Sequence, residues 1–350
     1  MFKEWIALFV ASLALSGWGD LPRALAQTTP DLTSAKTIQL PDLGAADRAP
    51  VITAVATDPA GDYLITAGDD HMVRVWNLKK DEVVHTINGH LDWIRDIAVC
   101  SDGRMMVTAG ADGRVRFYEF PSCKLLRELP PIETTIYAIA LSADGKRLAA
   151  PGADDKLRIL DTDSGRQLHL LDAAGPDIRA VAFAPTGMNI AAAGRGGAIR
   201  IWDAESGKVV GDLKQNARRI LALSWSADGS LLAAGGDART IQVWNVAGKK
   251  LDVELPEQHA AVASLCWCGS MLAAGDTSNM IQVWNVAQEQ RVCRLVGHSG
   301  TVATLVWNPT ASTLFSGAFD TTARVWKAEV WAGRIAGAKD DMEVSGAVRR

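Results

Sequence analysis

Residues 67–77, Ala-Gly-Asp-Asp-His-Met-Val-Arg-Val-Trp-Asn, carry a pattern that returns along the whole chain. Residues 235–245, Gly-Gly-Asp-Ala-Arg-Thr-Ile-Gln-Val-Trp-Asn, repeat it closely. A tryptophan or a substitute marks each copy, and successive markers lie 42 residues apart five times and 40 residues apart once: Trp76, Tyr118, Leu160, Trp202, Trp244, Trp284 and Trp326. Seven repeats of this length indicate a repeat architecture, because one such unit cannot bury its apolar faces alone.

Each repeat has the alternation of a β-strand around its marker. Arg or Gln stands two positions before the marker, and the positions beside it are almost all Val, Ile, Leu or Phe. A flatter apolar run, such as residues 231–235, comes earlier in the repeat and ends at a small residue. Earlier still is a segment that is apolar on both faces, as expected of a strand wedged between neighbours. These innermost strands are predicted at residues 52–57, 94–99, 136–141, 178–183, 220–225, 262–267 and 302–307.

With these repeats the chain resembles the WD-repeat β-propeller family over residues 36–327. The resemblance implies an all-β fold, a seven-bladed β-propeller of four-stranded antiparallel blades around a narrow channel. The expected repeat units are residues 41–78, 79–120, 121–162, 163–204, 205–246, 247–286 and 287–327. The last repeat lacks an obvious fourth strand, whereas residues 36–40 resemble an outer strand. We therefore expect residues 36–40 to complete blade seven and to remove an open sheet edge.

The chain termini differ from the repeats. Lys3, an uncharged run at residues 5–19 and the small residues before Gln27 are typical of a Sec signal peptide over residues 1–26, cleaved after Ala26. The expected location is periplasmic or secreted, with an uncleaved membrane anchor as the alternative, and the lack of a usable Asn-x-Ser/Thr sequon favours a bacterial source. Residues 27–35 are interpreted as a polar spacer. Residues 328–350 are interpreted as a flexible C-terminal tail, with docking of Val330 and Trp331 on blade seven as the alternative.

Composition favours one compact domain. The 350 residues are 48% hydrophobic and carry a net charge of −4, so there is ample apolar surface to bury and no bulk preference for nucleic acid. The five cysteines are odd in number, so at least one is free or pairs with another chain. We interpret them as thiols without a functional role: Cys100, Cys123, Cys266, Cys268 and Cys293.

The resemblance also implies buried tetrads of His, Ser or Thr, Asp and Trp that hold blades together. Blade seven has the full set of His298, Ser316, Asp320 and Trp326. Blade two has His90, Thr108 and Asp112 with Tyr118 replacing the Trp, and blade one has Thr66, Asp70 and Trp76 without the His. Blades three to six have alanine at the hydroxyl position: Ala150, Ala192, Ala234 and Ala274. Because these sets recur at the blade period, we interpret them as structural and predict no catalytic residues.

The channel offers little for chemistry. The second residues of the inner strands should face its upper part: Thr53, Arg95, Tyr137, Arg179, Leu221, Ala263 and Ala303. Asp96 is the only acid within the inner strands, since Asp58 lies in the turn that closes the first of them. The six histidines are scattered, so no metal site is predicted. No phosphate-binding Gly-x-x-x-x-Gly-Lys motif occurs, and no cofactor is expected. A channel hydrolase resembling a lactonase, or a small-molecule binder, is the alternative to a protein that is not an enzyme.

Partner-binding residues are predicted on the face that carries the loops between blades and between strands two and three: Trp93, Arg95, Tyr137, Arg179, Arg195, Arg218, Arg219 and Arg239. An exposed Trp and Tyr beside several arginines is typical of an interaction hot spot. The alternative for each arginine is a solvated loop residue. The sequence therefore predicts a non-catalytic interaction platform for a protein or an acidic peptide segment. We expect a monomer within a larger assembly, with no nucleic acid partner and no membrane contact after signal cleavage.

Overall fold

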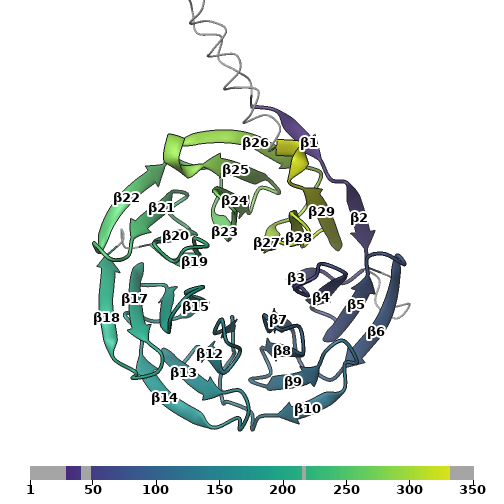
Figure 1. The fold of residues 1–350 in the computed structure, drawn as a ribbon, viewed down its shortest axis with the longest axis vertical. Helices are drawn as coiled ribbons and strands as arrows, with labels where there is room; N and C mark the ends of the chain where they lie inside the picture. The colour runs from purple at the N-terminus through teal and green to yellow at the C-terminus, as the bar shows by residue number, and fades with distance from the viewer. Residues whose placement is uncertain (1–28, 41–48, 215–217, 332–350) are drawn as a thin grey trace, which may run out of the picture.

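A computed structural model describes residues 29–40, 49–214 and 218–331, and these residues form seven antiparallel sheets around a central axis (Figure 1). The predicted seven-bladed β-propeller is confirmed. In blades one to six, four strands run from the innermost to the outermost in chain order, whereas the outermost strand of blade seven comes from the start of the propeller sequence. Among the described residues, no helix is both long enough and apolar enough to span a bilayer. The predicted signal peptide lies outside the described residues.

The first four blades take their strands from consecutive segments. Blade one comprises β3 (Ile52–Thr57), β4 (Tyr63–Gly68), β5 (Met72–Asn77) and β6 (Glu82–Asn88); blade two comprises β7 (Ile94–Val99), β8 (Met105–Gly110), β9 (Val115–Glu119) and β10 (Leu125–Glu128). Blade three comprises β11 (Ala140–Leu141), β12 (Arg147–Pro151), β13 (Lys156–Asp161) and β14 (Gln167–Asp172); blade four comprises β15 (Ile178–Phe183), β16 (Asn189–Gly194), β17 (Ala198–Asp203) and β18 (Val209–Lys214).

The last three blades include the segments that join the chain ends. Blade five comprises β19 (Ile220–Trp225), β20 (Leu231–Gly236), β21 (Ile241–Asn245) and β22 (Lys250–Leu255); blade six comprises β23 (Val262–Cys268), β24 (Met271–Asp276), β25 (Ile281–Asn285), the 3-10 helix η1 (Val286–Gln288) and β26 (Gln290–Val296). Blade seven comprises β27 (Val302–Asn308), β28 (Thr313–Ala318), β29 (Thr322–Lys327) and β2 (Lys36–Gln39), and β1 (Asp31–Thr33) lies outside β26 (Figure 1).

The core lies between neighbouring blades. Between blades three and four, for example, Leu157 and Ile159 pack in one cluster with Ile178, Ile190 and the marker Trp202. Inner strands can be apolar on both faces because each is covered by the blade on either side. The repeating markers are thus packing residues, and their period follows from the geometry of the ring.

The closing strand is confirmed. β2 pairs antiparallel with β29, with Lys36 opposite Val325 and Ile38 opposite Ala323. Ile38 and Leu40 are buried in a cluster that also contains Ile52 of blade one. Blade seven is therefore built from both ends of the propeller sequence, and β29 does not remain an open edge.

The polar spacer predicted at residues 27–35 is wrong for residues 31–33. These residues form β1, which pairs parallel with β26 and places Leu32 opposite Leu295. The physical reason is the single apolar side chain in this segment: Leu32 is buried against blade six, while Asp31 accepts a hydrogen bond from Arg294 Nε at 2.6 Å. Blade six thereby gains a fifth strand.

The flexible tail predicted at residues 328–350 is wrong at its start, where the alternative of docking on blade seven is confirmed for Trp331. A helical turn at residues 329–331 follows β29, and Trp331 is only 2% exposed. Its ring centroid lies 6.5 Å from that of Trp307, in the cluster between blades six and seven that also contains Leu32. Burial of a large aromatic surface holds this turn in place. The remainder of the tail lies outside the described residues.

The innermost strand of blade three is shorter than predicted. The segment expected at residues 136–141 forms only β11, with an isolated bridge between Ile136 and Gly152. Its backbone is held by blade two instead, because Ile136 N–H donates to Gly110 O at 3.2 Å and Ile139 N–H donates to the Asp96 carboxylate at 2.8 Å. Blade three is thus attached to its neighbour through the Asp96 side chain.

Candidate functional site

The channel opens into a cavity of about 380 Å³ at the face that carries the loops between blades. The seven residues predicted to face the channel all line it, although Tyr137 precedes the short strand β11: Thr53, Arg95, Tyr137, Arg179, Leu221, Ala263 and Ala303. They converge because each blade presents the same strand position to the axis. The cavity volume lies within the range of known ligand pockets.

Cationic and aromatic side chains alternate along one side of this mouth. Arg95 Cζ lies 4.7 Å from the ring centroid of Trp93 and 5.9 Å from that of Tyr137. Arg179 Cζ lies 3.6 Å from the same Tyr137 centroid. The four side chains therefore form a continuous stack over blades two to four, which we call the arginine–aromatic stack. Cation–π contacts of this kind contribute about 0.5–2 kcal/mol each.

The stack corrects the prediction that Trp93 and Tyr137 are exposed. Both side chains are half-buried, because guanidinium groups cover their faces. The aromatic surface of Trp93 and Tyr137 that a partner can reach is therefore smaller than that of two exposed rings.

The two cations of the stack differ in their charge partners. Arg179 Nε donates to Asp177 Oδ1 at 2.6 Å, and Asp177 Oδ2 lies 3.6 Å from Arg219 Nη2. Within the described part of the chain, Arg95 has no carboxylate at ion-pair distance, and its buried Nε has no hydrogen-bond acceptor. Burial lowers the pKa of Arg95 from its usual value, an effect that the nearby Tyr137 and Asp92 only partly oppose. Among the described residues, Arg95 is therefore a cation without an ion-pair partner, although Asp92 lies near enough to act on its charge.

The other predicted partner-binding arginines lie outside the cavity. Arg195 and Arg218 are exposed, in the β16–β17 turn and directly before β19 respectively. Arg239 is also exposed, in the β20–β21 turn, and pairs with Glu257. The structure therefore brings four of the eight predicted residues together in the stack and places Arg219 beside it.

The opposite side of the mouth is apolar. Leu221, Ala263 and Ala303 come from blades five to seven, and Phe319, which is 43% exposed, joins them from the β28–β29 turn. Sequence reasoning missed Phe319 because it lies outside the inner strands. It also missed Asp177, which bridges two arginines from a loop. Phe319 could have been predicted as a channel residue, because it directly precedes the tetrad residue Asp320 in a turn that faces the channel.

Asp96 is the acid of the cavity. Burial raises its pKa to about 7, although hydrogen bonds from Ile139 N–H and Ile97 N–H act in the opposite direction. Both carboxylate oxygens are thus engaged with backbone donors, and Asp96 joins blades two and three. No group of three or more His, Cys, Asp or Glu side chains that could hold a metal ion occurs among the described residues.

The predicted tetrad residues are hydrogen-bonded inside their blades. In blade seven His298 lies 2.9 Å from Asp320 and 2.7 Å from Ser316, whose hydroxyl accepts from Trp326 Nε1 at 2.9 Å. In blade two His90 lies 3.0 Å from Asp112 and 2.8 Å from Thr108. In blade one Trp76 Nε1 donates to Thr66 at 3.0 Å, and Asp70 pairs with Arg74 at 2.6 Å. The His and Asp side chains of blades two and seven are almost fully buried, so these sets act in blade packing.

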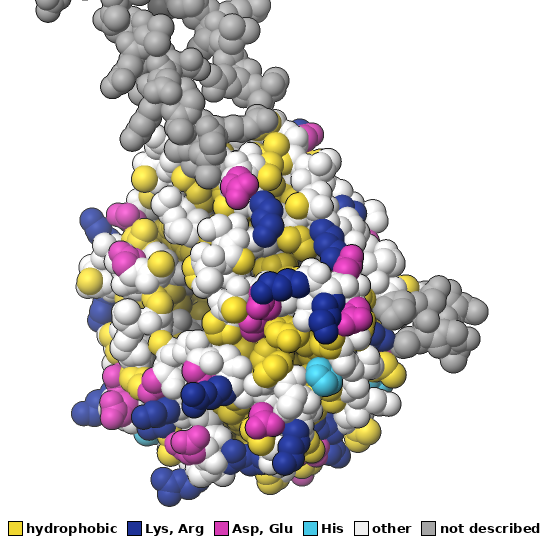
Figure 2. Space-filling model, turned by 45° about the vertical axis from the view of Figure 1, so that its right-hand side comes forward, with side chains coloured by type: hydrophobic (Ala, Val, Ile, Leu, Met, Phe, Trp, Pro, Cys, Tyr) yellow, Lys and Arg dark blue, Asp and Glu magenta, His cyan; other side chains and the backbone are white. Residues whose placement is uncertain are grey.

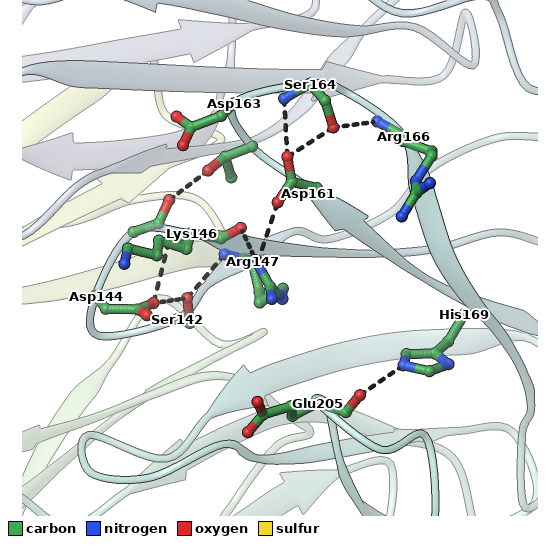
Figure 3. A network of polar contacts seen from close by, with 12 residues as sticks. Ser142, Asp144, Lys146, Arg147, Asp161, Asp163, Ser164, Arg166, His169 and Glu205 are labelled. Carbon is green, nitrogen blue, oxygen red and sulfur yellow. Dashed lines mark hydrogen bonds and ion pairs between the residues drawn. The ribbon is translucent and has the colours of Figure 1, made fainter.

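The opposite face of the ring has a different character. Figure 3 shows the turns of blade three there, where Ser142 donates to Asp144 and Arg147 pairs with Asp161 at 3.2 Å. The first bond closes the turn between β11 and β12, and the second joins residues that face each other across β12 and β13. Over the surface in Figure 2, basic and acidic side chains are interspersed, in keeping with the small net charge.

Comparison with known proteins agrees with this architecture. Residues 43–77, 81–119 and 289–327 match the WD domain, G-beta repeat family, and residues 171–228 match the Anaphase-promoting complex subunit 4 WD40 domain. A segment of 51 residues is 39% identical to the Nuclear distribution protein PAC1 of Coccidioides posadasii (strain C735). This segment covers 15% of this chain and 11% of that protein. The chain is a seven-bladed β-propeller that carries WD40 repeats. Propellers of this kind typically serve as protein-interaction scaffolds.

Proposed function

We propose that the chain is a non-catalytic platform that binds an acidic segment of another protein at the face carrying the arginine–aromatic stack. The observation that carries this proposal is the stack itself, which presents two guanidinium groups and two aromatic rings at the channel mouth. Arg, Trp and Tyr are the residues most enriched among interface hot spots. A rigid ring that holds them in place reduces the entropy lost on binding.

We further propose that this platform works outside the cytoplasm, in a periplasmic or secreted location, as a monomer within a larger assembly. The support is the signal-like sequence of residues 1–26, with its uncharged run and small residues before Gln27. Fractionation of the source cells, with amino-terminal sequencing of the isolated protein, tests the location. A first residue of Gln27 supports it, and an intact Met1 in the cytoplasmic fraction contradicts it.

Affinity capture tests the platform. The immobilised protein is compared with the double variant Trp93→Ala, Arg179→Glu, and bound proteins are identified by mass spectrometry. The matched control is Lys146→Glu, Arg166→Glu, because both side chains are exposed on the opposite face.

We expect one set of partners to bind the unaltered protein and the control but not the double variant, with thermal unfolding unchanged in all three. Capture that survives in the double variant contradicts the proposal. Loss of thermal stability in that variant shows that the stack serves folding instead.

A further inference from the structure

The cavity contains one cation, Arg95, for which the described residues provide no carboxylate at ion-pair distance. Arg95 and Arg179 both line the channel mouth, but Arg179 pairs with Asp177. Within the described ranges, Arg95 has no carboxylate partner, and the adjacent acid Asp96 directs its two oxygens to the N–H groups of Ile97 and Ile139. A partly buried charge without an opposite charge is unfavourable, so an anion at this position gains more than it does at a solvated arginine.

The stack also restricts where that anion can bind. The rings of Trp93 and Tyr137 flank the Arg95 guanidinium, at 4.7 and 5.9 Å from Cζ. Guanidinium N–H groups point outward in the plane of the group, so contacts with ring faces leave the edge formed by Nη1 and Nη2 free to donate, whereas Nε is buried. A planar carboxylate accepts two parallel hydrogen bonds from such an edge.

The remaining wall adds an apolar requirement. Leu221, Ala263 and Ala303 line the same cavity across the channel from Arg95, and Phe319 contributes an exposed ring. A ligand that fills the mouth therefore needs a carboxylate on one side and an apolar group on the other. The last residue of a polypeptide carries both on its Cα, and a chain end can enter a narrow mouth without turning back.

We propose that the channel mouth binds the C-terminal carboxylate of a partner chain, with Arg95 holding the carboxylate and the apolar wall receiving the last side chain. The inference rests on the proposed platform function and specifies which part of the partner is recognised. Arg179 contributes indirectly, since it stacks on Tyr137 and is neutralised by Asp177.

Calorimetric titration with synthetic peptides tests this assignment. The probe is acetyl-Gly-Ser-Gly-Ser-Leu with a free C-terminal carboxylate. The first comparison peptide is its C-terminal amide, and the second is acetyl-Gly-Ser-Glu-Ser-Leu amide, which carries its carboxylate on a side chain. Each is titrated into the full chain, into Arg95→Gln and into Arg239→Gln, a matched variant of an exposed arginine on the same face that lies outside the cavity.

We expect the free acid to bind the unaltered chain and Arg239→Gln at least about tenfold more tightly than the amide, as for a charge-assisted hydrogen bond. Arg95→Gln should remove this preference while leaving binding of the amide unchanged. The comparison of acid and amide uses the unaltered chain, so it remains decisive if Arg95→Gln does not fold.

Equal binding of acid and amide, or no binding of either, overturns the proposal. Binding of the glutamate peptide without binding of the free acid overturns the C-terminal assignment and points to an internal acidic segment. Partner capture that survives Arg95→Gln but is lost in Trp93→Ala, Arg179→Glu overturns this subsite and leaves the platform standing. If the peptide acid binds as expected but no partner is captured, the proposed platform function fails while the carboxylate subsite stands.

Discussion

At the scale of single residues, the buried pair of His90 and Asp112 links structure to pH. Their side chains are 1% and 4% exposed. A carboxylate only accepts hydrogen bonds, so His90 Nδ1 must carry the proton that lies between them. Burial has the largest influence and acts to raise the pKa of Asp112, but hydrogen bonds from His90, Leu91 N–H and Arg114 N–H together lower it from 3.8 to about 2.

This shift predicts an acid-sensitive contribution to stability. A carboxyl with a lower pKa in the folded state stabilises the fold above its unfolded pKa, and the contribution disappears as the pH falls through the folded pKa. Between pH 4 and pH 2 we expect the free energy of unfolding to fall by about 2 kcal/mol more in the unaltered chain than in Asp112→Asn. Urea denaturation followed by tryptophan fluorescence measures the difference. Parallel pH profiles for the two proteins contradict the prediction.

At the scale of strands and blades, the repeats differ in whether the indole N–H of the marker tryptophan has a hydrogen-bond acceptor. Trp76 and Trp326 donate to hydroxyl groups of Thr66 and Ser316. Blade six has Ala274 at the position equivalent to Ser316. The strand register shows this, because Ala274 lies opposite Gln282 just as Ser316 lies opposite Arg324. Among the described residues, Nε1 of Trp284 is accordingly buried without an acceptor. A buried polar group left unpaired costs about 1–3 kcal/mol.

The substitution Ala274→Ser should supply the missing acceptor. We expect it to raise the free energy of unfolding by about 1 kcal/mol, measured by chemical denaturation, since one hydrogen bond forms without a large change in volume. Ala150→Ser is the matched control, because the marker of blade three is Leu160 and offers no indole donor. The control should lower stability by burying an unpaired hydroxyl. If both variants behave alike, the indole of Trp284 does not lack an acceptor.

Strand positions were predictable to the extent that every blade repeats the same geometry. Six of the seven inner strands begin where the apolar pattern begins, from Ile52 in blade one to Val302 in blade seven. The exception, β11, depends on Asp96 in the neighbouring blade, and a pattern within one repeat cannot show that contact. The parallel pairing of β1 was missed for a similar reason: Leu32 contacts residues more than 200 positions away.

At the scale of the whole molecule, the candidate site was predictable in outline but not in its electrostatics. Because one strand position repeats around the axis, the sequence alone places Arg95, Tyr137 and Arg179 at the channel mouth. The stacking order and the neutralisation of Arg179 by Asp177 depend on side-chain conformations between blades. Residue spacing does not predict these conformations. Sequence reasoning therefore yields eight equivalent candidates, whereas the structure joins four of them in one stack around Arg95.

The ring is held closed on both sides of blade seven by segments from opposite ends of the chain. Ile38 of β2 is buried between blades seven and one, and Trp331 is buried between blades six and seven beside Trp307. Since every inner strand packs on two neighbours, opening either contact exposes blade seven as a whole. Closure should therefore influence the stability of the entire ring.

Substitution of either residue tests this closure. We expect Ile38→Ala to lower the free energy of unfolding by about 2–5 kcal/mol and Trp331→Ala by about 3–5 kcal/mol, from lost burial and the cavity left behind. Calorimetry should show one transition at a lower midpoint, because the blades share their cores. The controls are Thr37→Ala and Val330→Ala, whose side chains are exposed beside the same contacts. If Trp331→Ala unfolds at the same temperature as Val330→Ala, the helical turn after β29 rests on the ring without sealing it, and β2 alone closes the propeller.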